Sequence, residues 1–167
     1  MKNKSLNMLI VALLIIAAMS VMLFVFLDDA HDSFRDDVTV SANGVTEKIL
    51  NVRDLKLLPT EKNEYSVNFY CAASGLYGMT VDYVEKKDGG MKDYVNVTVL
   101  FADEVVYTGR LSELLDEKKD VLINFEGELH EVKPMTVTFI YEMPGNVGNE
   151  AQGTWADFDV CFKVTKL

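Results

Sequence analysis

The longest uninterrupted run of hydrophobic positions lies near the N-terminus, from Met8 to Leu27, and Ser20 is its only polar residue. These twenty residues, if helical, are long enough to cross the hydrocarbon core of a bilayer. Two lysines precede the run, at positions 2 and 4, and aspartates follow it between positions 28 and 37. The positive-inside rule therefore predicts a cytoplasmic N-terminus and a domain outside the membrane.

The length of this run also bears on whether it is removed after export. Apolar regions of cleaved signal peptides are usually about 7–15 residues long, so residues 8–27 are long for one. The stretch Leu27-Asp28-Asp29-Ala30 is also a poor cleavage site, because small residues are preferred there. We therefore expect residues 1–27 to be an uncleaved signal anchor, with a cleaved signal peptide as the alternative.

After an acidic spacer at residues 28–37, hydrophobic and polar positions alternate with a period of two, which is typical of half-buried strands. The predicted strands are, in chain order, Asp37–Ser41, Val45–Val52, Tyr65–Cys71, Leu76–Val84, Tyr94–Phe101, Glu104–Thr108, Val121–Phe125, Met135–Tyr141 and Ala156–Val164. Asn43-Gly44 is a strong turn signal and predicts a hairpin between the first two strands. Short strands at this spacing predict an all-β domain at residues 38–167, an antiparallel β-sandwich of jelly-roll type.

One short segment departs from the period of two. Leu111, Leu114 and Leu115 stand at the spacing of a single helical face. Ser112 is a candidate N-cap at the start of this segment. The pattern predicts one short helix that bridges two strands.

Charge narrows the classes of partner. The chain has a net charge of −10, and its first 27 residues contain two lysines and no acidic residue, so the remainder carries −12. A surface this acidic repels nucleic acid and anionic lipid headgroups, and it helps to keep an exported domain soluble. We expect no nucleic-acid partner.

The residues that could carry catalysis or bind a metal are few. The chain has two histidines, His31 and His130, and neither belongs to an HExxH motif. No serine stands in a G-x-S-x-G turn, and no glycine-rich phosphate loop precedes a helix. No calcium-binding loop of the EF-hand type is present, so weak calcium binding would rest on scattered carboxylates that the sequence does not place. We expect a non-enzymatic protein without catalytic residues, a cofactor or a metal site.

The two cysteines are predicted to lie on opposite faces of their strands. Cys71 falls on the apolar face of its predicted strand, whereas Cys161 falls on the polar face of its own. A disulfide between them would need a bulge, so it is disfavoured but stays open. We expect Cys71 to be buried, and Cys161 to be a free or an intermolecular thiol.

A segment near the C-terminus carries a resemblance to a known family. Residues 141–153 read Tyr-Glu-Met-Pro-Gly-Asn-Val-Gly-Asn-Glu-Ala-Gln-Gly and precede a strand that alternates phenylalanine and valine. This resembles the closing motif of the TasA/camelysin family of bacterial biofilm-matrix fibre proteins. The positions that carry the resemblance are Met143, Pro144, Gly148, Asn149, Gln152, Gly153 and Phe158. A looser likeness covers Leu57-Leu58-Pro59 and the following Glu64-Tyr65-Ser66-Val67, where Thr60 replaces the glycine that is usual in the family.

The resemblance implies a jelly-roll sandwich that is exported and, in the best-known members, assembles into extracellular fibres. Assembly in that family uses an N-terminal strand donated to the next subunit, and in this chain the donor would be about Asp37–Val52. The family motif is structural rather than catalytic. We expect its glycines to supply positive φ, Asn149 a left-handed conformation, and Gln152 a cap for backbone groups.

These observations lead to one main hypothesis about function. We expect an envelope-anchored or exported non-enzymatic β-sandwich that works by self-association or by contact with envelope or matrix proteins. The expected location is the bacterial cell membrane, with a single pass through residues 8–27 and the C-terminal domain outside. Cleavage of the N-terminal segment would instead release the domain to the matrix. An uncleaved anchor would limit fibre growth.

The alternative is an anchored adhesin or ligand-binding module that does not self-assemble. Exposed aromatic side chains would support it, and Tyr70, Tyr77, Tyr107 and Trp155 are the candidates. Packing at the edge of the sandwich is the simpler interpretation of all four, because scattered surface aromatics are common. A secreted protease is disfavoured for want of a set of metal ligands.

Overall fold

The computed structural model describes residues 34–129 and 134–167. The predicted signal anchor at residues 1–27 and both histidines lie outside these described residues. Within the described ranges, no helix is long and apolar enough to cross a membrane.

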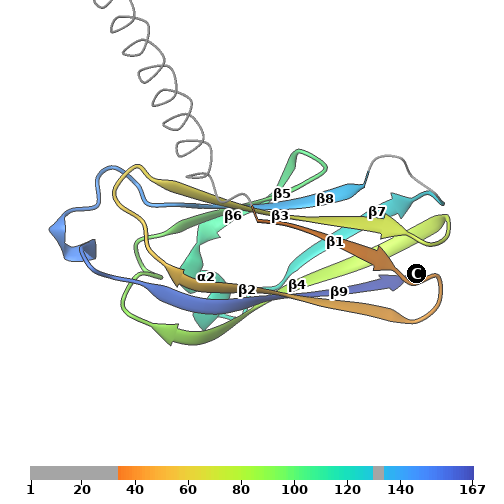
Figure 1. Cartoon of the computed structure of the whole chain (residues 1–167), viewed down its shortest axis with the longest axis horizontal. Coiled ribbons are helices and arrows are strands. Elements are labelled where there is room, and N and C mark those ends of the chain that lie inside the picture. The colour runs from red at the N-terminus through yellow and green to blue at the C-terminus, as the bar shows by residue number, and fades with distance from the viewer. Residues whose placement is uncertain (1–33, 130–133) are drawn as a thin grey trace, which may run out of the picture. The chain divides into compact units, whose positions relative to one another are not determined.

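The described residues form two facing β-sheets and one short α-helix (Figure 1). The strands are β1 (Phe34–Val40), β2 (Val45–Leu55), β3 (Lys62–Cys71), β4 (Gly75–Asp88), β5 (Asn96–Phe101), β6 (Glu104–Arg110), β7 (Val121–Gly127), β8 (Met135–Glu142) and β9 (Ala156–Lys166). One sheet has the order β1-β3-β8-β5-β6 and the other the order β2-β9-β4-β7. Strands β2 to β9 thus have the connectivity of a jelly roll, and β1 is an additional strand beside β3. The predicted all-β sandwich of jelly-roll type with one short helix is confirmed for the described residues, although β1 and β3 pair in parallel and not antiparallel as predicted.

The alternation of side chains explains how the two sheets enclose the core. In β7, Val121, Ile123 and Phe125 are buried, whereas the residues between them are exposed. The predicted inward face of β9 is also confirmed, because Phe158 and Phe162 are almost completely buried. Aromatic rings of one sheet meet those of the other at centroid distances between 5.0 and 6.3 Å. The core is therefore one continuous apolar layer between the sheets.

Two connections show what turn signals can and cannot specify. Ala102 and Asp103 both have positive φ, as a tight hairpin turn requires, and they join the antiparallel strands β5 and β6. The predicted hairpin at Asn43-Gly44 is wrong, because β1 pairs with β3 and β2 pairs with β9. The turn carries the chain from one sheet to the other. Strand β1 also begins at Phe34, within the acidic stretch that precedes the predicted domain.

The predicted helix is present as α2 (Leu111–Asp116), and its three leucines are buried. It begins one residue earlier than the proposed cap at Ser112, after Arg110. The Glu113 side chain accepts a hydrogen bond from the backbone N–H of Arg110 at 3.3 Å, so the start is fixed from within the first turn.

Cys71 and Cys161 form no disulfide with each other, and each lies on the face of its strand that the sequence predicted. Cys71 is buried on the inner face of β3, and Cys161 is half-buried on the outer face of β9. Burial raises the pKa of the Cys161 thiol, and neighbouring carboxylates of Asp159 and Asp82 raise it further. This thiol is therefore a weak nucleophile at neutral pH.

Candidate functional site

The family motif occupies the connection between β8 and β9, at the end of the sandwich opposite the β1–β2 turn (Figure 1). Met143 and Phe158 are fully buried at its two ends. Gly153 has a φ of +75°, as expected, but Gly148 has a φ of −88°, so the expectation of positive φ is wrong for that glycine. The expectation for Asn149 is wrong, because this residue opens the short 3-10 helix η1 (Asn149–Ala151) and has no positive φ. Its Oδ1 atom accepts a hydrogen bond from Gln152 Nε2 at 3.1 Å.

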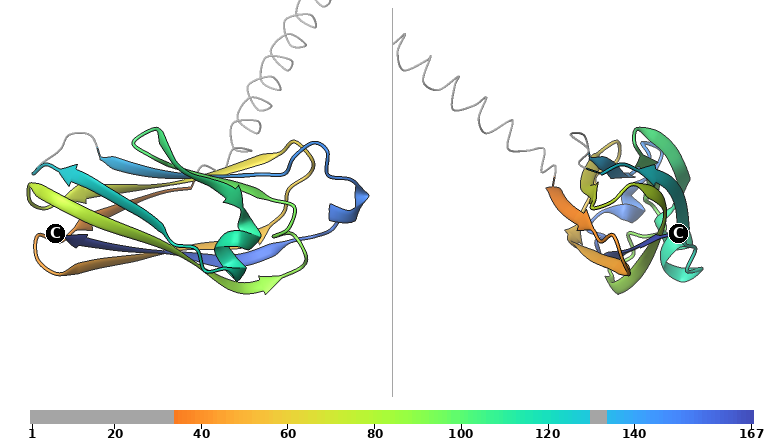
Figure 2. Two further views of the ribbon diagram at one scale, coloured as in Figure 1. Left: turned by 180° about the vertical axis from the view of Figure 1, so that it is seen from behind. Right: turned by 90° about the vertical axis from the view of Figure 1, so that its right-hand side faces the viewer.

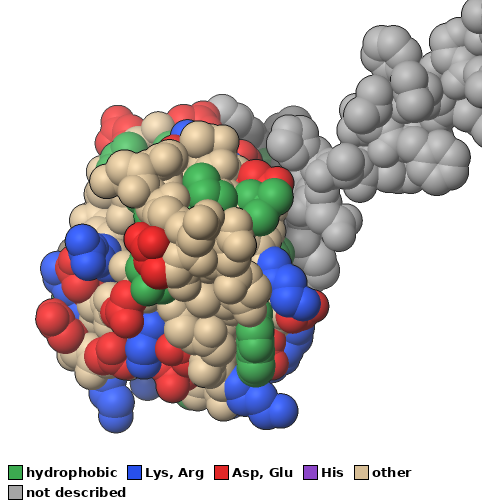
Figure 3. Space-filling view, turned by 90° about the vertical axis from the view of Figure 1, so that its left-hand side faces the viewer, with side chains coloured by type: hydrophobic (Ala, Val, Ile, Leu, Met, Phe, Trp, Pro, Cys, Tyr) green, Lys and Arg blue, Asp and Glu red, His purple; other side chains and the backbone are tan. Residues whose placement is uncertain are grey.

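A small hollow of about 120 Å³ lies beside this motif. Its lining comes from the β2–β3 and β8–β9 connections and comprises Leu57, Leu58, Pro59, Val147, Gly148, Asn149, Ala151 and Gln152. Figure 3 views this end of the domain, where charged side chains border a broad area of backbone and uncharged groups. The hollow combines apolar side chains with two amides and contains no charged group.

The turn that forms one wall of the hollow is strained. Thr60 has a φ of +75°, in the left-handed region that a β-branched residue rarely adopts. Pro59 precedes it, and the backbone N–H of Glu61 donates to the carbonyl of Leu58 at 2.9 Å, as in a type II turn. That turn favours glycine at the position of Thr60. The Thr60 N–H also donates to the Met143 carbonyl at 2.8 Å, so the turn is fixed to the family motif.

The four candidate binding aromatics do not form a common surface. Tyr77 is fully buried, and its hydroxyl donates to the carbonyl of Ala73. Tyr107 is half-buried against α2, where its hydroxyl donates to Glu113. Trp155 lies so close to Gly89 that a Cβ there would meet its indole nitrogen at 2.4 Å. Tyr70 lies on the outer face of β3, whereas Tyr77 is buried on the inner side of the sandwich.

Strand β1 forms an edge of the sandwich and covers part of its core. Strand β1 is the terminal strand of its sheet and runs parallel to β3 through seven residue pairs. Figure 2 shows β1, in orange, on the outside of the sandwich when it is viewed along the strands. Val38 and Val40 are 9% and 1% exposed, so they cover part of the core. We call the edge of β3 that β1 occupies the strand seat.

Polar contacts fix β1 on both sides of the strand seat. On one side, Asp36 forms an ion pair with Lys48 of β2. On the outer face, Asn68 Nδ2 donates to Asp37 Oδ1 at 2.6 Å, and Asn68 Oδ1 accepts from the Thr136 hydroxyl at 2.9 Å. Asn68 is only 2% exposed, which is unusual for an amide on an outer sheet face.

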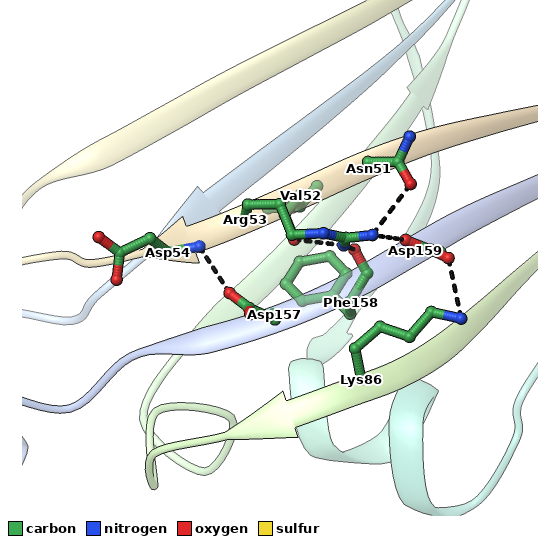
Figure 4. A network of polar contacts seen from close by, with 8 residues as sticks. All are labelled: Asn51, Val52, Arg53, Asp54, Lys86, Asp157, Phe158 and Asp159. Atoms are coloured by element: carbon green, nitrogen blue, oxygen red, sulfur yellow. Dashed lines mark hydrogen bonds and ion pairs between the residues drawn. The ribbon is translucent and has the colours of Figure 1, made fainter.

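Strand β2, the other part of the predicted donor, is more firmly held. It pairs with β9 through nine residue pairs. Figure 4 shows Arg53 at the centre of the contacts that reinforce this pairing, with Nη1 donating to the Phe158 carbonyl at 2.8 Å and Nη2 to Asp159 at 2.6 Å. Lys86 of β4 also pairs with Asp159 at 3.1 Å. Burial alone would raise the pKa of Asp159, but hydrogen bonds from Arg53 and Lys86 hold it below its usual value.

The sequence analysis did not identify Asn68. The alternation of β3 had assigned this residue to the polar face, and a polar face is ordinarily solvated. Its burial depends on Asp37 and Thr136, which lie 31 and 68 positions away along the chain. Among the described residues, no three histidine, cysteine or acidic side chains gather as metal ligands would.

No model of a known protein family matches the chain, and no curated protein matches it. Solved structures with a similar arrangement include PliG of Aeromonas hydrophila, a periplasmic inhibitor of g-type lysozyme. It is 8% identical over 80% of this chain and 99% of its own, with a TM-score of 0.34. The C-terminal domain of EclA, a sugar-binding protein, is 13% identical over 81% of this chain and 84% of its own, with a TM-score of 0.34. PorU from Porphyromonas gingivalis is 14% identical over 77% of this chain and 13% of its own, with a TM-score of 0.36.

Proposed function

We propose that this protein is an exported, non-enzymatic β-sandwich that acts by protein–protein contact, and that it associates with other copies by exchanging β1. The observation that carries the proposal is the position of β1, a short terminal strand outside the eight strands of the jelly roll. The resemblance to TasA and camelysin, whose members assemble by strand donation, supports the same function. Residues 1–27 would anchor the protein in the membrane, or be removed to release it.

Exchange is physically simple because both states make the same contacts. If β1 leaves, the strand seat loses the cover of Val38 and Val40 and exposes an unpaired edge of β3. A β1 strand from a second copy restores the same hydrogen bonds and buries the same apolar surface. The balance between the closed monomer and the exchanged assembly then depends mainly on local protein concentration and on the connecting turn.

The structure favours β1 over the longer predicted donor for this exchange. Removing β2 would break the longer ladder with β9 and leave Asp159, which is 7% exposed, without its Arg53 partner. Lys86 would remain as the only cation paired with this buried carboxylate, and the loss of one partner of a buried ion pair is expensive. Strand β1 can leave while β2 stays in place, because the two strands belong to different sheets.

A substitution on each face of β1 tests the proposal. Val40→Asp places a carboxylate where the side chain is 1% exposed, so β1 should no longer dock in any copy. Thr39→Asp introduces the same group at the neighbouring exposed position and is the matched control. We expect concentration-dependent oligomers of the wild type and of Thr39→Asp in sedimentation velocity and electron microscopy, and their loss in Val40→Asp. A wild-type protein that stays monomeric at every concentration and binds no envelope component would refute the proposal.

The hollow beside η1 favours a second function, ligand binding without assembly. It offers an apolar floor at Leu57 and Ala151, with polar groups at Asn149 and Gln152. A glycan or peptide array would detect such binding. A signal that is lost in Gln152→Ala and kept in Val40→Asp would favour this function over strand exchange.

A further inference from the structure

We propose that Asn68 selects the strand that occupies the strand seat, and that it accepts a segment with a hydrogen-bond acceptor at the position of Asp37 and β-branched residues one and three positions later. The β1 strand of a second copy has this pattern, Asp37-Val38-Thr39-Val40. This inference rests on the proposed exchange and adds the rule by which a partner strand is recognised.

The geometry places Asn68 between two strands that meet on the outer face of the sheet. Asp37, Asn68 and Thr136 are register partners on β1, β3 and β8. Thr136 engages the amide oxygen at 2.9 Å, which leaves the amide nitrogen directed at β1, where it donates to Asp37 at 2.6 Å. The tight contact and the 2% exposure of Asn68 show that this donor has a charged acceptor rather than bulk water.

Selection follows from what happens when a different strand binds. With the strand seat empty, water can reach the amide nitrogen, so the Asn68 amide itself is not left buried without an acceptor. An incoming strand with an apolar side chain opposite Asn68 would bury the donor without an acceptor, so the desolvation of the amide would not be compensated. Discrimination therefore comes chiefly from rejection of wrong strands.

The same contact fixes the register of the correct strand. A shift of one residue would turn Val38 and Val40 away from the core and direct them to the outer face. A shift of two residues can bring Arg35, which has only donors, opposite the donor of Asn68. On the inner side, Val38 pairs with Phe69 and Val40 with Cys71 in the observed register. Both faces of β1 thus specify one alignment.

Disulfide trapping between full-length chains provides the test. Thr39 and Tyr70 are register partners across the strand seat, and neighbouring strands lie about 4.8 Å apart, which suits a disulfide. One chain carries Thr39→Cys as donor and a second, with a tag of different size, carries Tyr70→Cys as acceptor. Both also carry Cys161→Ser. An intermolecular bond of the mixed size then reports a β1 strand seated in another copy.

The acceptor is compared in two forms. One form has the natural Asn68 and Asp37. The other, called the reversed acceptor, has Asn68→Asp together with Asp37→Asn in its own β1, so that each form matches its own strand. The reversed acceptor should take an Asp37→Asn donor but should capture the Asp37 donor about tenfold less, because two carboxylates would face each other. The acceptor with Asn68 should take both donors, because an asparagine oxygen can also accept from its amide.

The outcomes separate the two proposals. Absence of mixed disulfides in every pairing, including the pairing in which donor and acceptor keep the natural Asp37 and Asn68, would refute strand exchange itself. Equal capture of both donors by the reversed acceptor would overturn the role of Asn68 and leave exchange intact. Thermal melting checks that the reversed acceptor is folded. If it is not, an Asn68→Leu acceptor with Asp37→Leu in its own β1 replaces it, and equal capture of Asp37 and Asp37→Leu donors by that acceptor would equally overturn the inference.

Discussion

Thr60 combines an unfavourable backbone conformation with a central position between the β2–β3 turn and the family motif. Its φ of +75° requires a conformation that costs a β-branched residue about 1–3 kcal/mol. The backbone N–H of Thr60 donates to the carbonyl of Met143, and the Thr60 Cγ2 atom would be 2.9 Å from a Cβ added at Gly145. The surrounding contacts therefore hold the strained turn in place.

Thr60→Gly should stabilise the domain, because glycine adopts positive φ without this strain. The gain is offset by the greater freedom of glycine in the unfolded chain, so we expect a rise of about 1 kcal/mol in the free energy of unfolding. Urea denaturation monitored by the fluorescence of Trp155 measures it. Thr60→Ala, which shortens the side chain and keeps a Cβ, is the control and should gain less than Thr60→Gly.

Asp159 makes stability depend on acidic pH. Its folded-state pKa lies below its ordinary value because Arg53 and Lys86 donate to it, despite its burial. Its contribution is therefore fully present above the unfolded pKa of about 3.9 and is lost as the pH falls through the lower folded pKa. Asp159→Asn should lower the free energy of unfolding by about 1–2 kcal/mol at pH 7.

Asp159→Asn should also weaken the pH dependence of the stability of the fold below pH 5. Thermal melting between pH 7 and pH 2 compares it with Asp103→Asn, a change on the exposed β5–β6 turn. If both variants kept the acid sensitivity of the wild type, Asp159 would not be its source.

The short helix α2 depends on its neighbours, because six residues are too few to form a stable helix alone. Leu114 is fully buried, whereas Leu122 on β7 is 73% exposed. Leu114→Ala should therefore lower the free energy of unfolding by about 2–4 kcal/mol, and Leu122→Ala by less than about 0.5 kcal/mol. Chemical denaturation of both variants measures the difference. A small effect of Leu114→Ala would mean that α2 is not part of the core.

Local structure could be predicted from the sequence, whereas pairings between distant segments could not. The alternation in β7 and β9 and the turn at Ala102-Asp103 are local signals, and the structure confirmed them. The hairpin at Asn43-Gly44 failed because a turn motif specifies a change of direction but not the strand that becomes the partner. The burial of Asn68 could not be predicted for the same reason, since both of its partners come from distant strands.

At the scale of the whole molecule, the predicted anchor determines how far exchange can extend. An uncleaved segment would keep each β1 near the bilayer, so assemblies would be short and bound to the surface. We expect mass spectrometry of the full-length protein, after fractionation of the cells, to find residues 1–27 intact in the membrane fraction. A new N-terminus between residues 30 and 37, with release of the domain, would instead favour extended fibres.

If the protein is exported and exchanges β1 as proposed, the position of β9 would give export itself a role in assembly. This strand lies between β2 and β4, and the hydrogen bond from Arg53 to Phe158 joins residues 105 positions apart. In a chain that emerges from its N-terminal side, β1 reaches the outside long before β9, and pairings across such a distance form slowly. During that delay a neighbour with a finished fold can capture the waiting strand. The pace of secretion, more than the final affinity, would then decide which chains become linked.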